Sequence, residues 1–250
     1  NQETLELYVP EECRSAVGNK EIARFKFARV LGPDVTQEEV FHATVRNTVS
    51  ACLRGFSGAI FAYGQTNSGK TWTVTGGESL EDRGLAPRVI VSLFEGIQGD
   101  ADDGQNVRYQ VRASYIEVYE GRVYDLLDVS NREKSLEEWP AVSMSTDSEG
   151  VQFIKGVTTF EVKNDAEEAL NLFFMGNAHR VMGETPDNQA SSRSHAIFTL
   201  GVSSERKERH ADAVKLGEDG TETGTVVTQS ELSLIDLAGS ERMYKNDRHG

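Results

Sequence analysis

The sequence predicts an α/β fold in which a central, mostly β-sheet is flanked by helices on both faces. Three observations predict it. A short apolar run at 58–63 leads into a glycine-rich loop and then into a helix-forming segment. Apolar residues alternate along 107–115 and 196–202, as they do in strands, and they recur at helical spacing along 87–97. At 250 residues, the chain is long enough for one large domain with a sizeable core.

The first elements follow from local signals. A strand is expected over 24–31, and Thr36 then caps a helix with Glu39 at the capping-box position. The apolar face of this helix consists of Phe41, Val45, Val49, Cys52 and Leu53. Gly55 is suited to end it. The next long helix begins near Pro87, and its core stripe consists of Val89, Ile90, Leu93, Phe94 and Ile97.

The middle of the chain gives weaker signals. A polar, irregular stretch is expected over 130–148, with Trp139 as its anchor, and a strand pair around 151–162. Asp165 and Glu168 form a capping signal for a further helix. The residues of that helix that face inward are expected to be Leu170, Phe173 and Phe174.

Another weak region follows the strand at 196–202. We expect a long solvated loop over 203–225, because the segment is polar and rich in glycine and charge. The last strand then ends at Asp236.

The segment 64–71 reads GQTNSGKT and satisfies the pattern G-x-x-x-x-G-K-[ST]. Glycines let the backbone wrap closely, so that successive N–H groups point at phosphate oxygens. Lys70 is expected to bridge the β- and γ-phosphates, and the Thr71 hydroxyl to hold Mg²⁺. A plain glycine-rich turn is the alternative, but the preceding strand and following helix favour a phosphate loop.

A second metal-side carboxylate is predicted at the end of the apolar strand 232–236. Asp236 stands where a strand-terminal aspartate holds Mg²⁺ directly or through water. Gly239 follows, and a glycine there lets a backbone N–H approach the γ-phosphate. Taken alone, Asp-x-x-Gly more often marks a buried strand that ends in a turn.

The segment 188–195, NQASSRSH, is rich in hydroxyl groups and carries one cation. Most serine clusters are polar surface loops. The functional alternative is a switch loop that closes over the γ-phosphate, with one hydroxyl on Mg²⁺ and another on the attacking water. Arg193 would then pair with Glu241 and shut the site.

Together these three segments resemble the kinesin motor domain. Further agreement lies at 37–41, 84–88 and 115–119. The resemblance runs from about residue 24 to 250, whereas residues 1–23 match poorly. It implies a kinesin-type P-loop NTPase fold with the phosphate loop at 64–71, a first switch at 188–195 and a second switch at 236–241.

The resemblance also implies ATP and Mg²⁺ as ligands. The catalytic residues it implies are Asn188, Ser191, Arg193, Gly239 and Glu241. The nucleotide-binding residues it implies are Gly64, Gln65, Thr66, Asn67, Ser68, Gly69, Lys70, Thr71 and Trp72. The metal ligands it implies are Thr71, Ser192 and Asp236, the last through water.

The sequence departs from the family pattern at several points. Trp72 stands where His or Tyr is usual, and it either stacks on adenine or serves as a packing residue. Ala28 replaces a usual Asp, and no Arg-x-Arg-Pro segment opens the chain. Asn1 is not a start methionine, and the family's main microtubule-binding helices would follow residue 250. We therefore expect the middle of a motor domain, cut at both ends.

The expected function is a microtubule-stimulated ATPase that moves along, or exerts force on, microtubules in the cytoplasm and cytoskeleton. An absent stalk would set the oligomeric state. The alternative is a kinesin-shaped microtubule- or tubulin-binding module without motility. The presence of both Lys70 and Arg193 speaks against loss of hydrolysis. A GTPase is disfavoured because no Asn-Lys-x-Asp segment occurs.

Composition restricts the partners. With 26 basic and 40 acidic residues, the formal charge is −14, which argues against nucleic acid and anionic membranes as partners. Microtubules are acidic too, so their binding would need a local basic patch. No apolar stretch of membrane-spanning length occurs. Cys13 and Cys52 form no metal-binding spacing.

Overall fold

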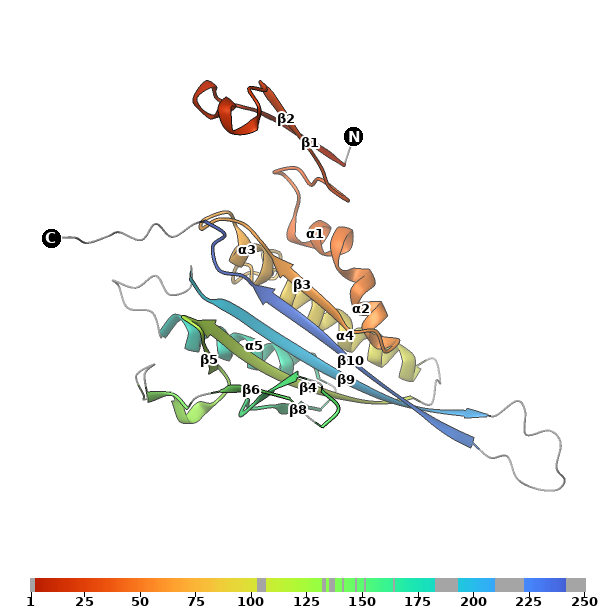
Figure 1. The fold of residues 1–250 in the computed structure, drawn as a ribbon. Coiled ribbons are helices and arrows are strands. Elements are labelled where there is room, and N and C mark those ends of the chain that lie inside the picture. Colours follow the sequence, from red (N-terminus) through yellow and green to blue (C-terminus); the bar gives the residue numbers. More distant parts are fainter. Residues whose placement is uncertain are drawn as a thin grey trace.

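A mixed sheet of six strands organises the molecule, as the computed structural model shows (Figure 1). The structure describes residues 3–102, 107–131, 134, 138–140, 142–146, 148–150, 152–163, 165–182, 193–209 and 223–241. The strand order is β3-β10-β9-β4-β5, with β8 also on β4. The bounds are β3 Gly58–Ala62, β4 Val107–Tyr119, β5 Arg122–Asp125, β8 Phe160–Val162, β9 His195–Arg209 and β10 Thr223–Asp236. β3 runs parallel to β10, and the other pairs are antiparallel.

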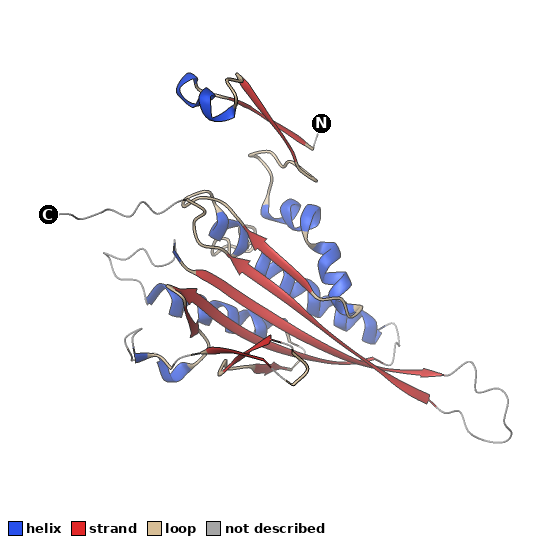
Figure 2. Cartoon of the chain, in the orientation of Figure 1, coloured by secondary structure: helices blue, strands red, loops and turns tan. Residues whose placement is uncertain are grey.

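The helices pack against one face of this sheet (Figure 2). They are α1 Gln37–Thr44, α2 Arg46–Leu53, α3 Lys70–Val74, α4 Leu85–Asp102 and α5 Ala166–Met182, with 3₁₀ turns η1 Glu11–Val17 and η2 Val129–Asn131. The predicted sheet with flanking helices is confirmed. Within the described residues the helical layer lies on one face only, so a second layer stays a prediction. None of the described helices combines the length and apolar character needed to cross a bilayer.

The core lies between this helical layer and the sheet. Strand alternation directs Val111, Phe198 and Leu234 toward the helices, and all three are buried. The stripe predicted on α4 is confirmed, because all five of its members are buried: Val89, Ile90, Leu93, Phe94 and Ile97. Polar and half-exposed residues such as Thr199 and Gln229 line the opposite sheet face.

The helix predicted after Thr36 begins as expected, but it is two helices rather than one. Thr36 and Glu39 form the full capping box. The break falls at Val45, which closes α1 with φ −115° and ψ −15°. The Thr44 hydroxyl donates to the Val40 carbonyl at 2.6 Å, a side-chain bond that bends helices.

Two small antiparallel pairs lie outside the main sheet. β1 (Thr4–Tyr8) pairs with β2 (Ile22–Lys26), so the strand expected over 24–31 is displaced toward the N-terminus. β6 (Ser143–Thr146) pairs with β7 (Gln152–Lys155), whereas β8 joins β4. The prediction of one strand pair around 151–162 was therefore wrong. β7 takes its partner from the stretch expected to be irregular, and the left-handed turn at Gly156 (φ 91°) follows it.

The long loop expected over 203–225 was wrong at both of its ends, whereas 210–222 lie outside the described residues. β9 continues to Arg209 and β10 starts at Thr223, paired in unbroken register (Figure 1). The described part of β4 begins at Val107, which lies opposite Arg206, so the last residues of β9 pair only with β10 among the described residues. The described side chains in this part of the ribbon, Arg206, Thr225 and Val226, are exposed. The sequence there lacks the apolar alternation that indicates a half-buried strand.

The helical layer makes a direct stability prediction. Leu93 is fully buried at the centre of α4, so Leu93→Ala should lower the free energy of unfolding by about 2–5 kcal/mol. Leu80→Ala is the matched control, since Leu80 is 71% exposed and should change stability by less than about 0.5 kcal/mol. Urea unfolding of both variants measures the difference. Equal effects would show that α4 is not part of the core.

Candidate functional site

The phosphate loop lies between β3 and α3, as predicted. Gly69 precedes the first residue of α3 with φ 91° and ψ 14°, a left-handed conformation that glycine adopts without strain. Asn67 is also left-handed, with φ 63°. The ammonium group of Lys70 donates to the Gln65 carbonyl at 2.8 Å, so lysine and loop backbone already face each other. This is the arrangement of a loop that surrounds a phosphate.

Thr71 and Asp236 meet beside the loop, because parallel pairing of β10 with β3 places Asp236 level with Ala62. The Thr71 hydroxyl donates to Oδ2 of Asp236 at 2.8 Å, which leaves the hydroxyl lone pairs available to a cation. Oδ1 of Asp236 is buried and has no hydrogen-bond partner among the described residues. A hydroxyl oxygen beside an unpaired carboxylate oxygen is a donor set that suits Mg²⁺.

The segment 236–241 folds onto the loop. The Ser240 amide donates to the Gly64 carbonyl at 3.0 Å. The carboxylate of Glu241 accepts the Thr66 amide at 2.9 Å and a very short bond from the Thr66 hydroxyl. These hydrogen bonds to Thr66, with a smaller contribution from the charge of Lys70, lower the pKa of Glu241. A negative group therefore already occupies one of the loop's amide donors.

Of the first switch, only its end can be placed. Asn188, Ser191 and Ser192 lie outside the described residues, and Arg193 is exposed. The ion pairs of the described part of the chain do not join Arg193 to Glu241, so that bridge stays a prediction.

The two switch segments nevertheless touch near their bases. The Ala238 amide donates to Nδ1 of His195 at 3.1 Å. The last residue of the first switch, which is also the first residue of β9, thereby accepts a hydrogen bond from the backbone of the second switch. A Cβ added at Gly239 would lie 2.3 Å from the Glu241 carboxylate, so a larger residue there would have to displace this side chain.

Trp72 is half exposed at 52% and lies on α3 directly after Thr71. Its carbonyl accepts a 2.7 Å hydrogen bond from the Gln37 side chain, which ties α3 to α1. An aromatic ring with this much free surface is available for stacking on a base. Stacking of Trp72 on adenine stays a prediction.

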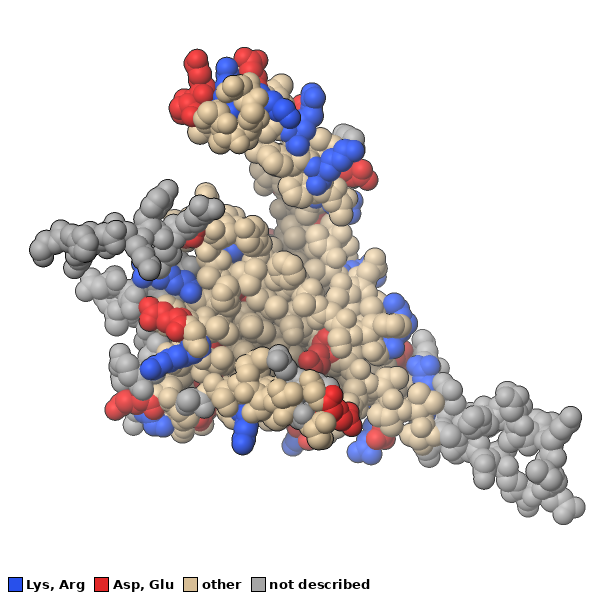
Figure 3. All heavy atoms as spheres, viewed as in Figure 1, with Lys and Arg blue, Asp and Glu red and all other residues tan. Residues whose placement is uncertain are grey.

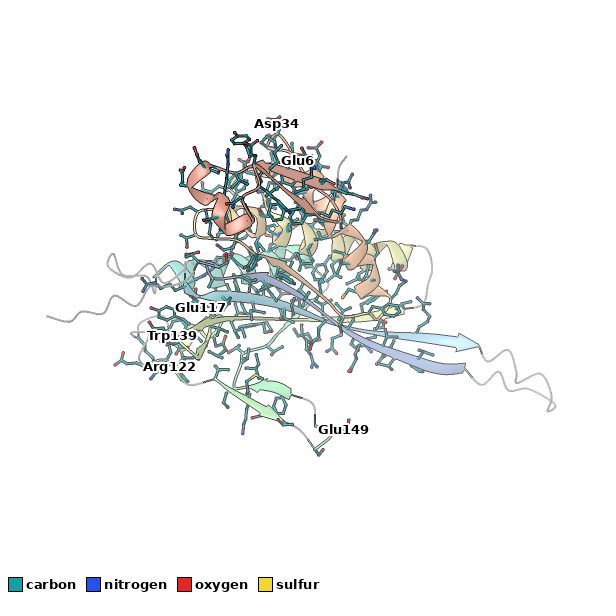
Figure 4. The ribbon with its side chains drawn as sticks, turned by 45° about the horizontal axis from the view of Figure 1, so that its top comes forward. Glu6, Asp34, Glu117, Arg122, Trp139 and Glu149 are labelled. Atoms are coloured by element: carbon teal, nitrogen blue, oxygen red, sulfur yellow. The ribbon has the colours of Figure 1, made fainter. Side chains whose placement is uncertain are left out.

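Sequence reasoning missed a buried ion cluster behind the loop. Arg180 on α5 donates through Nη1 to Oδ2 of Asp236 at 2.8 Å, and its Nε lies 3.3 Å from Oε1 of Glu117. Ser194 donates to the same Glu117 oxygen at 2.5 Å. Figure 4 shows Glu117 at the end of the sheet where Trp139 and Arg122 also lie.

Strand register explains how this cluster forms. Glu117 on β4 lies opposite Ala196 on β9, and Ala196 lies opposite Asp236 on β10. The three residues share the helix-facing side, so the two carboxylates are on strands roughly 10 Å apart with a small residue between them. Arg180 bridges this gap. Burial alone would lower the pKa of Arg180, but the hydrogen bond and charge of Asp236 outweigh it and raise that pKa.

A signal for this cluster was present in the sequence. Glu117 continues the inward alternation of Val111, Ala113 and Tyr115, and an acid at an inward position predicts a buried partner. Arg180 follows Phe173 by seven residues, which places both on the inward face of α5. Removing one partner of such a buried pair typically costs about 3–5 kcal/mol.

The glycine-rich loop follows a central strand, and Thr71 lies beside a strand-terminal aspartate. The segment 236–241 folds onto this loop. Together these features define a P-loop nucleotide-binding fold. The kinesin motor domain family model matches residues 7–250. The match begins within the segment 1–23 that carries little of the motif resemblance. The chain belongs to the kinesin motor domain family.

Individual relatives agree with this assignment. Kinesin-like protein KIF27 of Rattus norvegicus is 35% identical over 246 residues, which are 97% of this chain and 16% of that protein. Kinesin-like protein KIF3C of Bos taurus is 38% identical over 224 residues, which are 88% of this chain and 25% of that protein. A solved structure of a fast kinesin superposes with a TM-score of 0.78 at 28% identity, covering 100% of this chain and 61% of the other. The chain thus spans a sixth to a quarter of these curated relatives.

The loop conformation predicts a specific sensitivity to substitution at Gly69. Gly69→Ala meets no neighbouring atom within 4 Å, so its effect would come from the left-handed φ of 91° alone. That strain is about 1–2 kcal/mol, and we expect nucleotide affinity to fall by about tenfold. Gly99→Ala in α4 is the control, because it also meets no atom and has no positive φ. Nucleotide affinity is measured by titration. Equal affinity in the two variants would show that the left-handed conformation of Gly69 is not needed for nucleotide binding.

Proposed function

We propose that this chain binds Mg·ATP at the phosphate loop and hydrolyses it, and that the motor domain to which it belongs couples hydrolysis to movement along microtubules. The observation that carries the proposal is the contact of Thr71 with Asp236 beside the loop, with Oδ1 of Asp236 unpaired. Kinesins as a family hydrolyse ATP. For this chain, we further propose that microtubules stimulate the hydrolysis of ATP.

The residues of the loop would hold the phosphates. Lys70 would exchange the Gln65 carbonyl for phosphate oxygens, a gain because a charged acceptor forms the stronger hydrogen bond. Thr71 and Asp236, together with Ser192 of the first switch, would hold Mg²⁺. When bound there, Mg²⁺ neutralises charge on the phosphate oxygens and orients them.

Glu241 would act as the moving part of the second switch. Its carboxylate occupies the Thr66 amide and hydroxyl, which lie in the loop that receives the phosphates. A triphosphate in the loop would repel this carboxylate and compete for the same donor. Glu241 would then be released to pair with Arg193, which is exposed and forms no ion pair with another described residue. Asn188 and Ser191 would order the attacking water, and Gly239 would sense the γ-phosphate.

Contact with microtubules would be local rather than driven by overall charge. Figure 3 shows acidic and basic side chains interspersed on the visible face, without one broad basic patch. The net charge of −14 has the same sign as a microtubule. We therefore infer that the microtubule surface depends on a limited set of residues and on parts of the motor outside this chain.

The first test is the ATPase rate of the full-length protein with and without polymerised microtubules. We expect strong stimulation in the parent. In Lys70→Ala we expect loss of nucleotide binding itself, because the loop loses its only lysine charge. Tight nucleotide binding without any stimulation would indicate a nucleotide-dependent binding module in place of a motor. Parental nucleotide affinity in Lys70→Ala would remove the loop from the account.

A second test concerns the switch bridge. Glu241→Ala and Arg193→Ala should each leave nucleotide affinity nearly unchanged and lower the hydrolysis rate, by about tenfold or more, because each removes one partner of the closed switch. Exposed Glu231→Ala, at a residue on the same strand as Asp236, is the control. Single-turnover hydrolysis separates the chemical step from product release. Parental rates in either switch variant would contradict the roles of both residues.

A further inference from the structure

One arginine joins the two switch segments behind the loop. The guanidinium of Arg180 donates through Nη1 to Asp236 and through Nη2 to the Ser194 hydroxyl at 3.4 Å, and its Nε faces Glu117. Each of these four residues is at most 7% exposed. Ser194 belongs to the first switch and Asp236 begins the second. The bases of both switches are therefore fixed to the same planar group.

The contact to Asp236 uses only one of the two carboxylate oxygens. Oδ2 accepts from both Arg180 and Thr71, at 2.8 Å each, whereas Oδ1 has no hydrogen-bond partner among the described residues. With Oδ2 held from two sides, the carboxylate cannot rotate without breaking two bonds. Its orientation, and thus the availability of Oδ1, is set by the protein rather than by the metal.

We propose that Arg180 is a positioning residue for metal binding, which fixes the carboxylate of Asp236 so that Oδ1 stays free for the magnesium shell. Ser194, held by the same guanidinium and by Glu117, keeps the first switch in register with that carboxylate. This inference rests on the proposed function, since it concerns the same Mg·nucleotide site. Arg180 touches neither metal nor nucleotide and acts through Asp236.

The geometry explains why an arginine is needed. Its fork presents separate nitrogens to Glu117 and Asp236, which lie two strands apart on either side of Ala196. A lysine ammonium has a single nitrogen and can satisfy one of these carboxylates well, but not both in this geometry. Arg180→Lys therefore keeps the buried positive charge but removes the separate nitrogens that face the two carboxylates.

The test measures how much Mg²⁺ adds to nucleotide affinity in the full-length protein. Binding of a fluorescent ADP analogue is titrated once with Mg²⁺ and once with EDTA, and the ratio of the two affinities gives the metal contribution. We expect this ratio to fall by about 10–100-fold in Arg180→Lys, as for other groups that orient metal ligands. Affinity in EDTA should stay near the parental value. Arg122→Lys, at an exposed arginine on neighbouring β5, is the control.

Two further variants separate positioning from a general structural role. In an Asp236→Asn background, Arg180→Lys should lower the ratio no further, because the carboxylate it positions is gone. Glu117→Gln keeps the shape of the cluster and should lower the ratio in the same direction, so the test does not depend on the folding of Arg180→Lys alone. Thermal unfolding followed by circular dichroism monitors the fold of each variant.

An unchanged ratio in well-folded Arg180→Lys would overturn the inference, as would an equal loss of affinity with Mg²⁺ and with EDTA. The same loss in the Asp236→Asn background would overturn it too. A parent that binds the nucleotide more tightly with Mg²⁺ than with EDTA leaves the proposed function standing when the inference fails. A parent that binds no nucleotide would overturn the proposed function itself.

Discussion

The buried ion pair between Arg180 and Asp236 is the interaction on which the arrangement of the site depends. It fixes the end of β10, where the second switch begins, against α5 and against Glu117 on β4. Burying three charged groups is favourable only when they are paired, and strand register brings Glu117 and Asp236 within reach of one guanidinium. The helical layer, the sheet and the nucleotide site are thereby coupled through one guanidinium.

The segment at 240–241, which must move, is attached more weakly than the buried cluster around Arg180. Glu241 and Ser240 contact the phosphate loop at its exposed surface, through hydrogen bonds that solvent and phosphate can replace. Arg180, by contrast, is only 7% exposed and is held by buried partners. The site therefore combines a buried base with an outer segment that can exchange hydrogen-bond partners. We propose that the base orients the metal ligands and that the two switches attached to it report the presence of a γ-phosphate.

Much of this could be predicted from sequence, because local rules decide it. The loop at 64–71, the capping box at Thr36 and the stripe on α4 follow from fixed spacings. The β9–β10 ribbon could not be predicted, since its sequence lacks the apolar alternation that a half-buried strand carries. The partner of Glu117 could not be identified either, because Arg180 is distant in sequence and only the packing of α5 against β4 brings the two together. The sequence indicated that Glu117 is buried, whereas only the folded structure identified Arg180 as its counterion.

The most direct test of this account is a structure of the protein with Mg²⁺ and a non-hydrolysable ATP analogue. The account predicts phosphates in the 64–71 loop and Mg²⁺ next to Thr71, with Oδ1 of Asp236 directed at the metal shell. It also predicts that Glu241 has left Thr66 while Arg180 still holds Asp236. Nucleotide bound elsewhere, or a complex in which Arg180 has released Asp236, would contradict the central claim.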